Sequence, residues 1–307
     1  IARYRKEVTG SLNDEQLRAL SERLVYLRNL EEKKASVLAT IEEQGKLTDE
    51  LKKQIEAVMT MVALEDLYRP YRPKRRTRAT IAKEKGLEPL AEILRAQATT
   101  RTIEEEATAF VDAEKGVESV QDAIDGAKDI LAEVYADDAD YRTKLRAMTK
   151  ESGSLVAKAK DEEADSVYEM YYDFSEPIKK LVGHRILAIN RGEAEKFLTV
   201  KIEAPRQEIL LWLVKQIIGN MKHDSASYLY EAITDSYDRL IAPSIEREIR
   251  NELTEKAEEG AIGVFGKNLH QLLMQPPISG QVVLGWDPGF AHGSKLAVVD
   301  ETGKVLD

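Results

Sequence analysis

The sequence predicts a mainly α protein: a multi-helix region with a small β portion, followed by the first strands of an α/β domain. The clearest helical signal is the recurrence of Leu17, Leu20, Leu24, Leu27 and Leu30 at three- and four-residue steps. Charged residues make up 33% of the 307 residues and aromatic residues only 6%, which favours helices with long solvated faces. After residue 280, short apolar runs alternate with Gly-containing turns, as strands do.

Capping and breaking residues delimit the first helices. Ser11 is the expected N-cap of a long helix over residues 12–59. Gly45 interrupts this helix, Thr48 restarts it, and the next helix ends at Pro70. Further helices are expected over residues 79–85, 88–95, 102–151, 209–218 and 225–274.

Two regions carry strand signals. Helical periodicity weakens over residues 154–205, and Leu198–Ile202 alternates apolar and polar residues, so the small β portion is expected there. Val282–Trp286, Lys295–Val299 and Lys304–Leu306 are the expected first strands of the second domain.

Composition excludes several classes of site. The chain has no cysteine, which excludes disulfides, thiolate nucleophiles, Fe–S clusters and zinc fingers. The longest uncharged run, Asn268–Trp286, contains two prolines, so no membrane span and no membrane partner are expected. This composition favours a cytoplasmic protein. Because the sequence begins at Ile1 and ends at Asp307 in a strand-like segment, we expect a fragment of a longer protein.

The net charge of −10 hides one basic segment. Between Arg69 and Lys85 there are eight basic residues and one acid, Glu84, so this window carries +7 and the remaining chain carries −17. Residues 69–78, here called the arginine linker, contain two prolines, which favour non-helical backbone through Pro73. Its basic residues are Arg69, Arg72, Lys74, Arg75, Arg76 and Arg78.

The arginine linker has two interpretations. Arginine side chains bind phosphate oxygens bidentately, and the interleaved Tyr68 and Tyr71 could stack on bases, which together indicate nucleic-acid binding. Alternatively, the arginines pair with acidic helices of the same chain and the linker is a structural clamp. The sequence leaves both open.

Asp287 is a candidate metal ligand and catalytic residue. Within Gly285–Gly289 it lies at the end of an apolar run, before an open turn, where a two-metal phosphotransfer site needs its first carboxylate. Asp-Pro-Gly is also an ordinary turn sequence, and no convincing partner carboxylates follow. His292, in the turn, is the one histidine expected near Asp287. We therefore expect no cofactor and no enzymatic activity in this fragment, and nuclease activity of the longer protein stays open. Mg²⁺ or Mn²⁺ would be needed only by a nuclease at Asp287.

Several long segments resemble the Tex family of bacterial transcription accessory proteins, in the order of that family. They are Ile1–Leu12, Leu64–Ala82, Phe110–Gly116, Gly183–Gly192 and Val283–Gly289. Leu64–Ala82, which contains the arginine linker, is the most diagnostic of them. The resemblance spans essentially the whole chain.

The resemblance implies more than the residues alone. It implies that residues 1–280 form a helical region with a helix-turn-helix-like element, and that residues 281–307 begin a YqgF-type, ribonuclease-H-like domain. Helix-hairpin-helix modules and a C-terminal S1 RNA-binding domain would follow. Asp287 matches the first acidic position of ribonuclease-H-like sites, but this chain has Ala291-His292-Gly293 where the family usually has Arg-Thr-Gly, which removes an expected phosphate contact.

We therefore expect a nucleic-acid-binding transcription accessory factor that acts around RNA polymerase. It would bind RNA or DNA through the basic residues of the arginine linker, with Tyr71 as a stacking residue. Two alternatives stay open: a metal-dependent nuclease or resolvase at Asp287, and an acidic platform that docks a protein partner.

Overall fold

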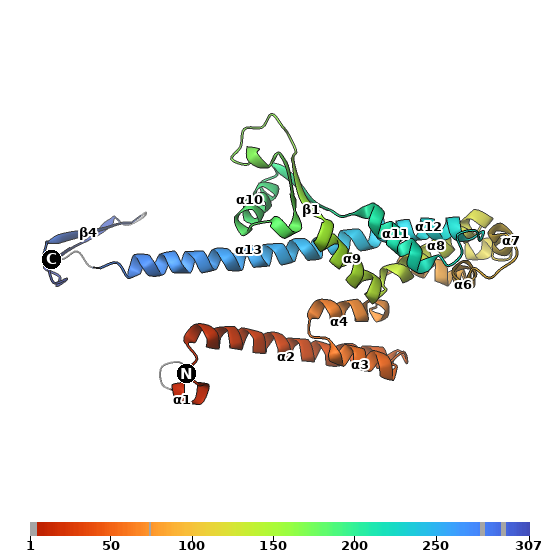
Figure 1. The fold of residues 1–307 in the computed structure, drawn as a ribbon, viewed down its shortest axis with the longest axis horizontal. Coiled ribbons are helices and arrows are strands. Elements are labelled where there is room, and N and C mark those ends of the chain that lie inside the picture. Colours follow the sequence, from red (N-terminus) through yellow and green to blue (C-terminus); the bar gives the residue numbers. More distant parts are fainter. Residues whose placement is uncertain (1–4, 74, 277–279, 290–292) are drawn as a thin grey trace. The chain divides into compact units, whose positions relative to one another are not determined.

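The structure, a computed structural model, describes residues 5–73, 75–276, 280–289 and 293–307 and is mainly α-helical, as predicted (Figure 1). The chain forms two compact units. The first comprises Ile1–Leu181 and Ala188–Glu252, and the second comprises Val182–Leu187 and Leu253–Asp307. The predicted domain boundary at residues 280 and 281 stays a prediction.

Four helices open the first unit: α1 (Lys6–Thr9), α2 (Asp14–Glu43), α3 (Asp49–Ala57) and α4 (Met61–Tyr68). The expected cap at Ser11 is wrong, because Ser11 has a φ of 70° and α2 is instead capped by Asn13. Asn13 Oδ1 accepts from the Gln16 amide at 2.8 Å, and Gln16 Oε1 accepts from the Asn13 amide at 3.0 Å. The predicted break at Gly45 and restart at Thr48 are confirmed.

A single apolar cluster joins α2, α3 and α4. Its buried members are Leu30, Val37, Ile41, Leu51, Ile55 and Leu64. Half-buried side chains pack around this cluster, among them Tyr68 and Tyr71, which begin the segment that leads out of α4. The cluster therefore holds the first residues of the arginine linker in place against α2, α3 and α4.

Helix α8 (Val120–Ala136) is the centre of the next group, with α5 (Arg78–Glu84), α6 (Glu88–Ala96), α7 (Ile103–Thr108) and α12 (Ala226–Asp235) packed around it. Close packing depends on small residues of α8: a Cβ at Gly126 would lie 2.3 Å from Leu87 Cδ1. Helix α9 (Ala139–Ser152) follows. The expected continuous helix over residues 102–151 is thus three helices, since a turn over Ala113–Lys115 and a short break near Asp137 interrupt it.

The β portion is confirmed as a three-stranded antiparallel sheet in the order β2-β1-β3. It consists of β1 (Ser154–Ala159), β2 (Asp173–Pro177) and β3 (Leu198–Glu203). Val156 of β1 lies opposite Ser175 of β2 and Lys201 of β3. In β3, Leu198, Val200 and Ile202 are buried and their neighbours are exposed, which is the alternation that the sequence predicted.

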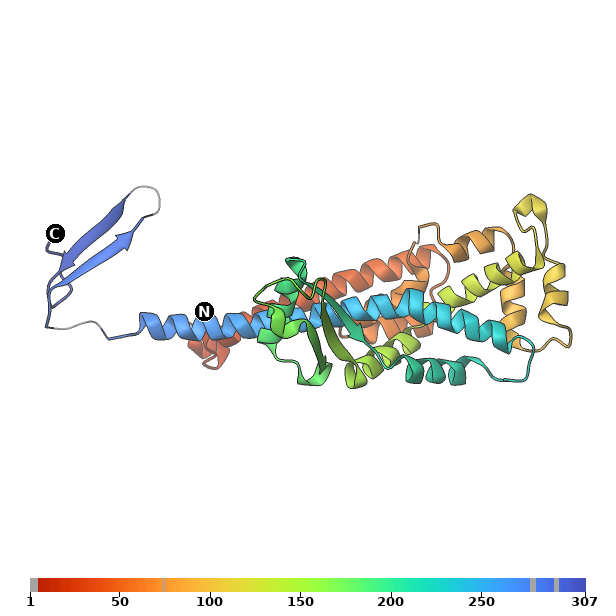
Figure 2. The ribbon, with the colours of Figure 1, turned by 90° about the horizontal axis from the view of Figure 1, so that it is seen from above.

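The remaining elements are helical until the last hairpin. Helix α10 (Gly183–Ala194) lies between β2 and β3 in the sequence, and α11 (Arg206–Ile217) follows β3. A π-helical segment, Ser236–Ile241, joins α12 to α13 (Ala242–Leu273), so the helical backbone continues from α12 into α13 without a loop (Figures 1 and 2). Among the described residues, no helix is long and apolar enough to cross a membrane.

The last element is a hairpin of β4 (Val283–Pro288) and β5 (Ser294–Val299). The third strand expected at Lys304–Leu306 is reduced to a single bridge between Val299 and Val305.

Candidate nucleic-acid interface

The arginine linker connects α4 to α5 within the first unit. The expectation of non-helical backbone through Pro73 is only partly right, since Arg69–Tyr71 form one 3-10 turn. Pro70 is tolerated there because the first N–H groups of a helical turn need no intrahelical acceptor. The chain is extended at Arg72, and Thr77 caps α5 by accepting a hydrogen bond from the Thr80 amide at 3.1 Å.

Both ends of the linker are held in place. At its start, Tyr71 packs against the apolar cluster of α2, α3 and α4, and its carbonyl accepts a hydrogen bond of 2.8 Å from Gln44 Nε2. At its end, Thr77 and Thr80 form a reciprocal capping box. The half-buried Tyr71 ring therefore has a structural role, and its stacking role stays a prediction.

Arg69 has the contact that the clamp interpretation requires. Its Nε lies 3.1 Å from Oδ1 of Asp137, whose side chain is only 12% exposed. Asp137 is the C-cap residue of α8, where the helix macrodipole is negative and favours a cation. Arg69 thus joins the linker to the end of α8.

The next arginines lie toward solvent. The side chains of Arg72 and Arg76 are 66% and 72% exposed, and their nearest carboxylates are Glu65 at 3.9 Å and Glu84 at 3.5 Å. Exposed pairs of this length contribute about 0–1 kcal/mol, so phosphates can replace them at little cost. Among the described residues, no carboxylate lies within 4.0 Å of the exposed Arg75.

Arg78 and Lys74 complete the predicted set. Arg78 begins α5 and borders a cavity of about 420 Å³ whose acidic lining includes Asp125, Asp129 and Asp235. Burial raises the pKa of the Asp129 carboxyl above its ordinary value, and the positive charges of Arg239 and Arg78 only partly oppose this. Lys74 lies outside the described residues.

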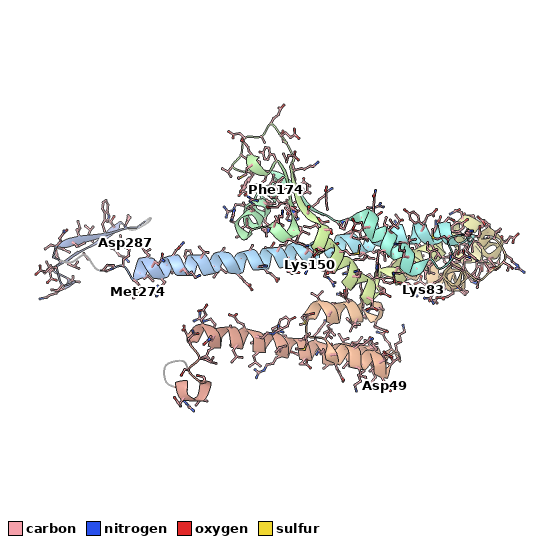
Figure 3. All side chains as sticks on the ribbon, viewed as in Figure 1. Asp49, Lys83, Lys150, Phe174, Met274 and Asp287 are labelled. Carbon is pink, nitrogen blue, oxygen red and sulfur yellow. The ribbon has the colours of Figure 1, made fainter. Side chains whose placement is uncertain are left out.

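Two cavities border the linker. One, of about 460 Å³, is lined by Arg69, Arg72 and Arg75 together with Glu133 and Asp137 of the α8 end. The other, of about 670 Å³, shares Arg72, Pro73, Glu133 and Asp137 and adds more distant residues, among them Lys46, Tyr71 and Lys83. Figure 3 labels Lys83 on α5. Nothing local in the sequence pointed to Lys46, because only folding brings the end of α2 to the linker.

The helix-turn-helix-like element stays a prediction. Three residues, Lys85–Leu87, join α5 to α6, which matches such an element in length. The exposed residues of α6 include Glu88 and Glu92, however, and carboxylates oppose rather than favour contact with a nucleic-acid backbone.

Asp287 lies on β4 (Figure 3), directly opposite Lys295 of β5. It is exposed, and among the described residues no group of three or more His, Asp or Glu side chains could hold a metal ion. A single carboxylate opposite a lysine does not fit a two-metal site. His292, the other residue expected here, lies outside the described residues.

Two stretches of the chain match known protein families. Residues 98–265, more than half of its length, match the family described as Tex central region-like, and residues 1–42 match the Tex-like protein N-terminal domain. The chain belongs to the Tex family. The resemblance inferred from its sequence segments is thereby confirmed.

Relatives of this Tex-family chain align over its full length. They include the uncharacterized protein YdcI of Bacillus subtilis, 50% identical over 309 residues, and the transcriptional accessory protein Tex of Neisseria gonorrhoeae, 42% identical over 315. The human S1 RNA-binding domain-containing protein 1 is 33% identical over 321 residues. Each alignment covers 100% of this chain but only 43%, 41% and 32% of the respective relative. The chain thus spans about two fifths of the length of the first two.

Proposed function

We propose that this chain is a nucleic-acid-binding part of a transcription accessory protein that acts around RNA polymerase. In this proposal the exposed side of the arginine linker binds phosphates of RNA or DNA. The observation that carries it is the exposure of Arg72, Arg75 and Arg76 on a segment whose two ends are fixed. The names of two relatives, a transcriptional accessory protein and an S1 RNA-binding domain-containing protein, support the wider role.

The charge of the chain and the fixed ends of the linker both support this assignment. The rest of the chain carries −17, so general attraction to a polyanion is weak and binding has to be local. A linker held at Tyr71 and at Thr77 loses less conformational entropy on binding than a loop with free ends, because the positions of its two ends are already fixed. Exposed guanidinium groups then offer forked donors to phosphate oxygens.

A salt titration tests the proposal. Affinity of the 307-residue chain for a labelled single-stranded RNA and for a DNA duplex is measured against salt concentration. The double substitution Arg75→Ala/Arg76→Ala removes two phosphate-binding side chains, so it should reduce the slope of log affinity against log salt by roughly 1.4 for the single strand and 1.8 for the duplex. The strand type with the higher affinity identifies the preferred nucleic acid.

The matched control removes the same charge elsewhere. Arg101 and Lys222 are exposed and lie outside the linker, so Arg101→Ala/Lys222→Ala should leave the slope within about 0.3 of the parent value. If the linker variant and the control show the same slope, the arginine linker is a structural clamp and the proposal is wrong.

A further inference from the structure

The C-terminal end of α8 is negatively charged and faces the arginine linker. The last turn of α8 contains Glu133 and no basic residue, and Asp137 caps the helix. The helix macrodipole adds further negative potential at this end. Asp137 is already in contact with Arg69 at 3.1 Å.

These carboxylates line the same cavities as arginines that are proposed to bind phosphate. Glu133 and Asp137 line both cavities beside the linker, together with Arg72, and Arg75 lines one of them. A phosphate bound in either cavity would therefore lie beside the carboxylates. Carboxylate and phosphate are alternative partners for the same guanidinium groups.

We propose that the acidic end of α8, Glu133 and Asp137, regulates the arginine linker as an internal competitor for its arginines. The proposal rests on the proposed function of the linker. In the free protein the carboxylates attract the charges of Arg72 and Arg75 across the cavities that they share, without an ion pair within 4.0 Å between these described residues, and a bound phosphate has to overcome this attraction.

Glu133→Gln tests the proposal because it removes one charge and keeps the size of the side chain. At about 0.1 M salt it should tighten binding of a labelled single-stranded RNA about two- to fivefold, as expected for one unit charge removed beside the bound phosphates. The matched control is Glu118→Gln, an exposed carboxylate just before the opposite end of the same helix. About 20 Å of helix separate the two positions, which exceeds the Debye length, so the control should change affinity by less than about 1.5-fold.

A double-mutant cycle separates competition from simple repulsion. If Glu133 acts by attracting the arginines, the gain from Glu133→Gln should fall by at least half in the Arg72→Ala background. An undiminished gain in that background, or equal effects of Glu133→Gln and Glu118→Gln, would overturn the proposal. Failure of the proposed function would give a different result from failure of this proposal. In that case Arg75→Ala/Arg76→Ala would leave the salt dependence of binding unchanged, regardless of the effect of Glu133→Gln on affinity.

Discussion

A buried ionic network joins three helices of the first unit and allows a quantitative prediction. Asp66 of α4 accepts hydrogen bonds from Arg142 Nε at 2.7 Å and from Arg146 Nη2 at 2.8 Å, both on α9. Glu248 of α13 accepts from Arg142 Nη2 at 2.6 Å and from Arg146 Nε at 2.8 Å. Two arginines are thus balanced by two carboxylates.

The perturbation is Asp66→Asn, which keeps the shape of the side chain and removes its charge. The Arg142 and Asp66 side chains are only 1% and 6% exposed, so water cannot replace the lost carboxylate. The network is left with one uncompensated positive charge. Removal of one partner from a buried pair costs about 3–5 kcal/mol, and Glu248 still pairs with both arginines, so we expect a loss of about 3 kcal/mol in the free energy of unfolding.

The assay is urea unfolding followed by far-UV circular dichroism, with Glu65→Gln as the control. Glu65 is the adjacent residue on α4 and is exposed, and it pairs only loosely, with Lys33 at 3.7 Å and Arg72 at 3.9 Å. Its substitution should therefore cost less than about 1 kcal/mol. If Asp66→Asn costs no more than Glu65→Gln, the network contributes nothing to stability and the reasoning is refuted.

Three further predictions concern pH, packing and Asp287. Burial raises the pKa of Glu248, but the hydrogen bond and charge of Arg146 outweigh this effect and hold the pKa below its ordinary value. The stabilisation by Glu248 should therefore be full above about pH 5 and should be lost as the pH falls through the lowered pKa. Glu248→Gln should flatten that part of a curve of the free energy of unfolding against pH. Gly153→Ala should destabilise the chain by about 1–3 kcal/mol in thermal unfolding, because its Cβ would lie 2.4 Å from the carbonyl oxygen of Thr149; an unchanged midpoint would contradict this. With Mg²⁺ or Mn²⁺, the chain should not cleave labelled RNA, and cleavage that is lost in Asp287→Asn would establish the nuclease alternative.

Local signals in the sequence predicted most of the helices and strands. The helix start at Thr48 and the alternation of β3 depend on residues within one or two turns of each other, so they can be identified without tertiary structure. The predicted N-cap of α2 was wrong because two local signals competed, since Ser11 and Asn13 are both good N-cap residues. Only the structure, in which Ser11 has left-handed backbone, shows that Asn13 is the cap.

The candidate interface was only partly accessible to sequence analysis. The sequence located the basic charge in the arginine linker, since eight basic residues in 17 are visible without a structure. The sequence does not show which of Arg69 and Arg72 is paired and which is exposed, because both directly precede a proline in the same segment. Only the packing of α8 places Asp137, 68 residues further along the chain, against Arg69 and leaves Arg72 exposed.

The sequence by itself therefore determined the mainly α class, most element positions, the family and the location of the basic segment, because each depends on local order along the chain. The tertiary structure alone decided which linker arginine pairs with a buried carboxylate, which carboxylates border the linker, and how Asp66, Arg142 and Glu248 form one network. Asp66 and Arg142 lie 76 residues apart and Arg142 and Glu248 lie 106 apart. Contacts across such separations are set by the packing of helices, which no local pattern of residues records.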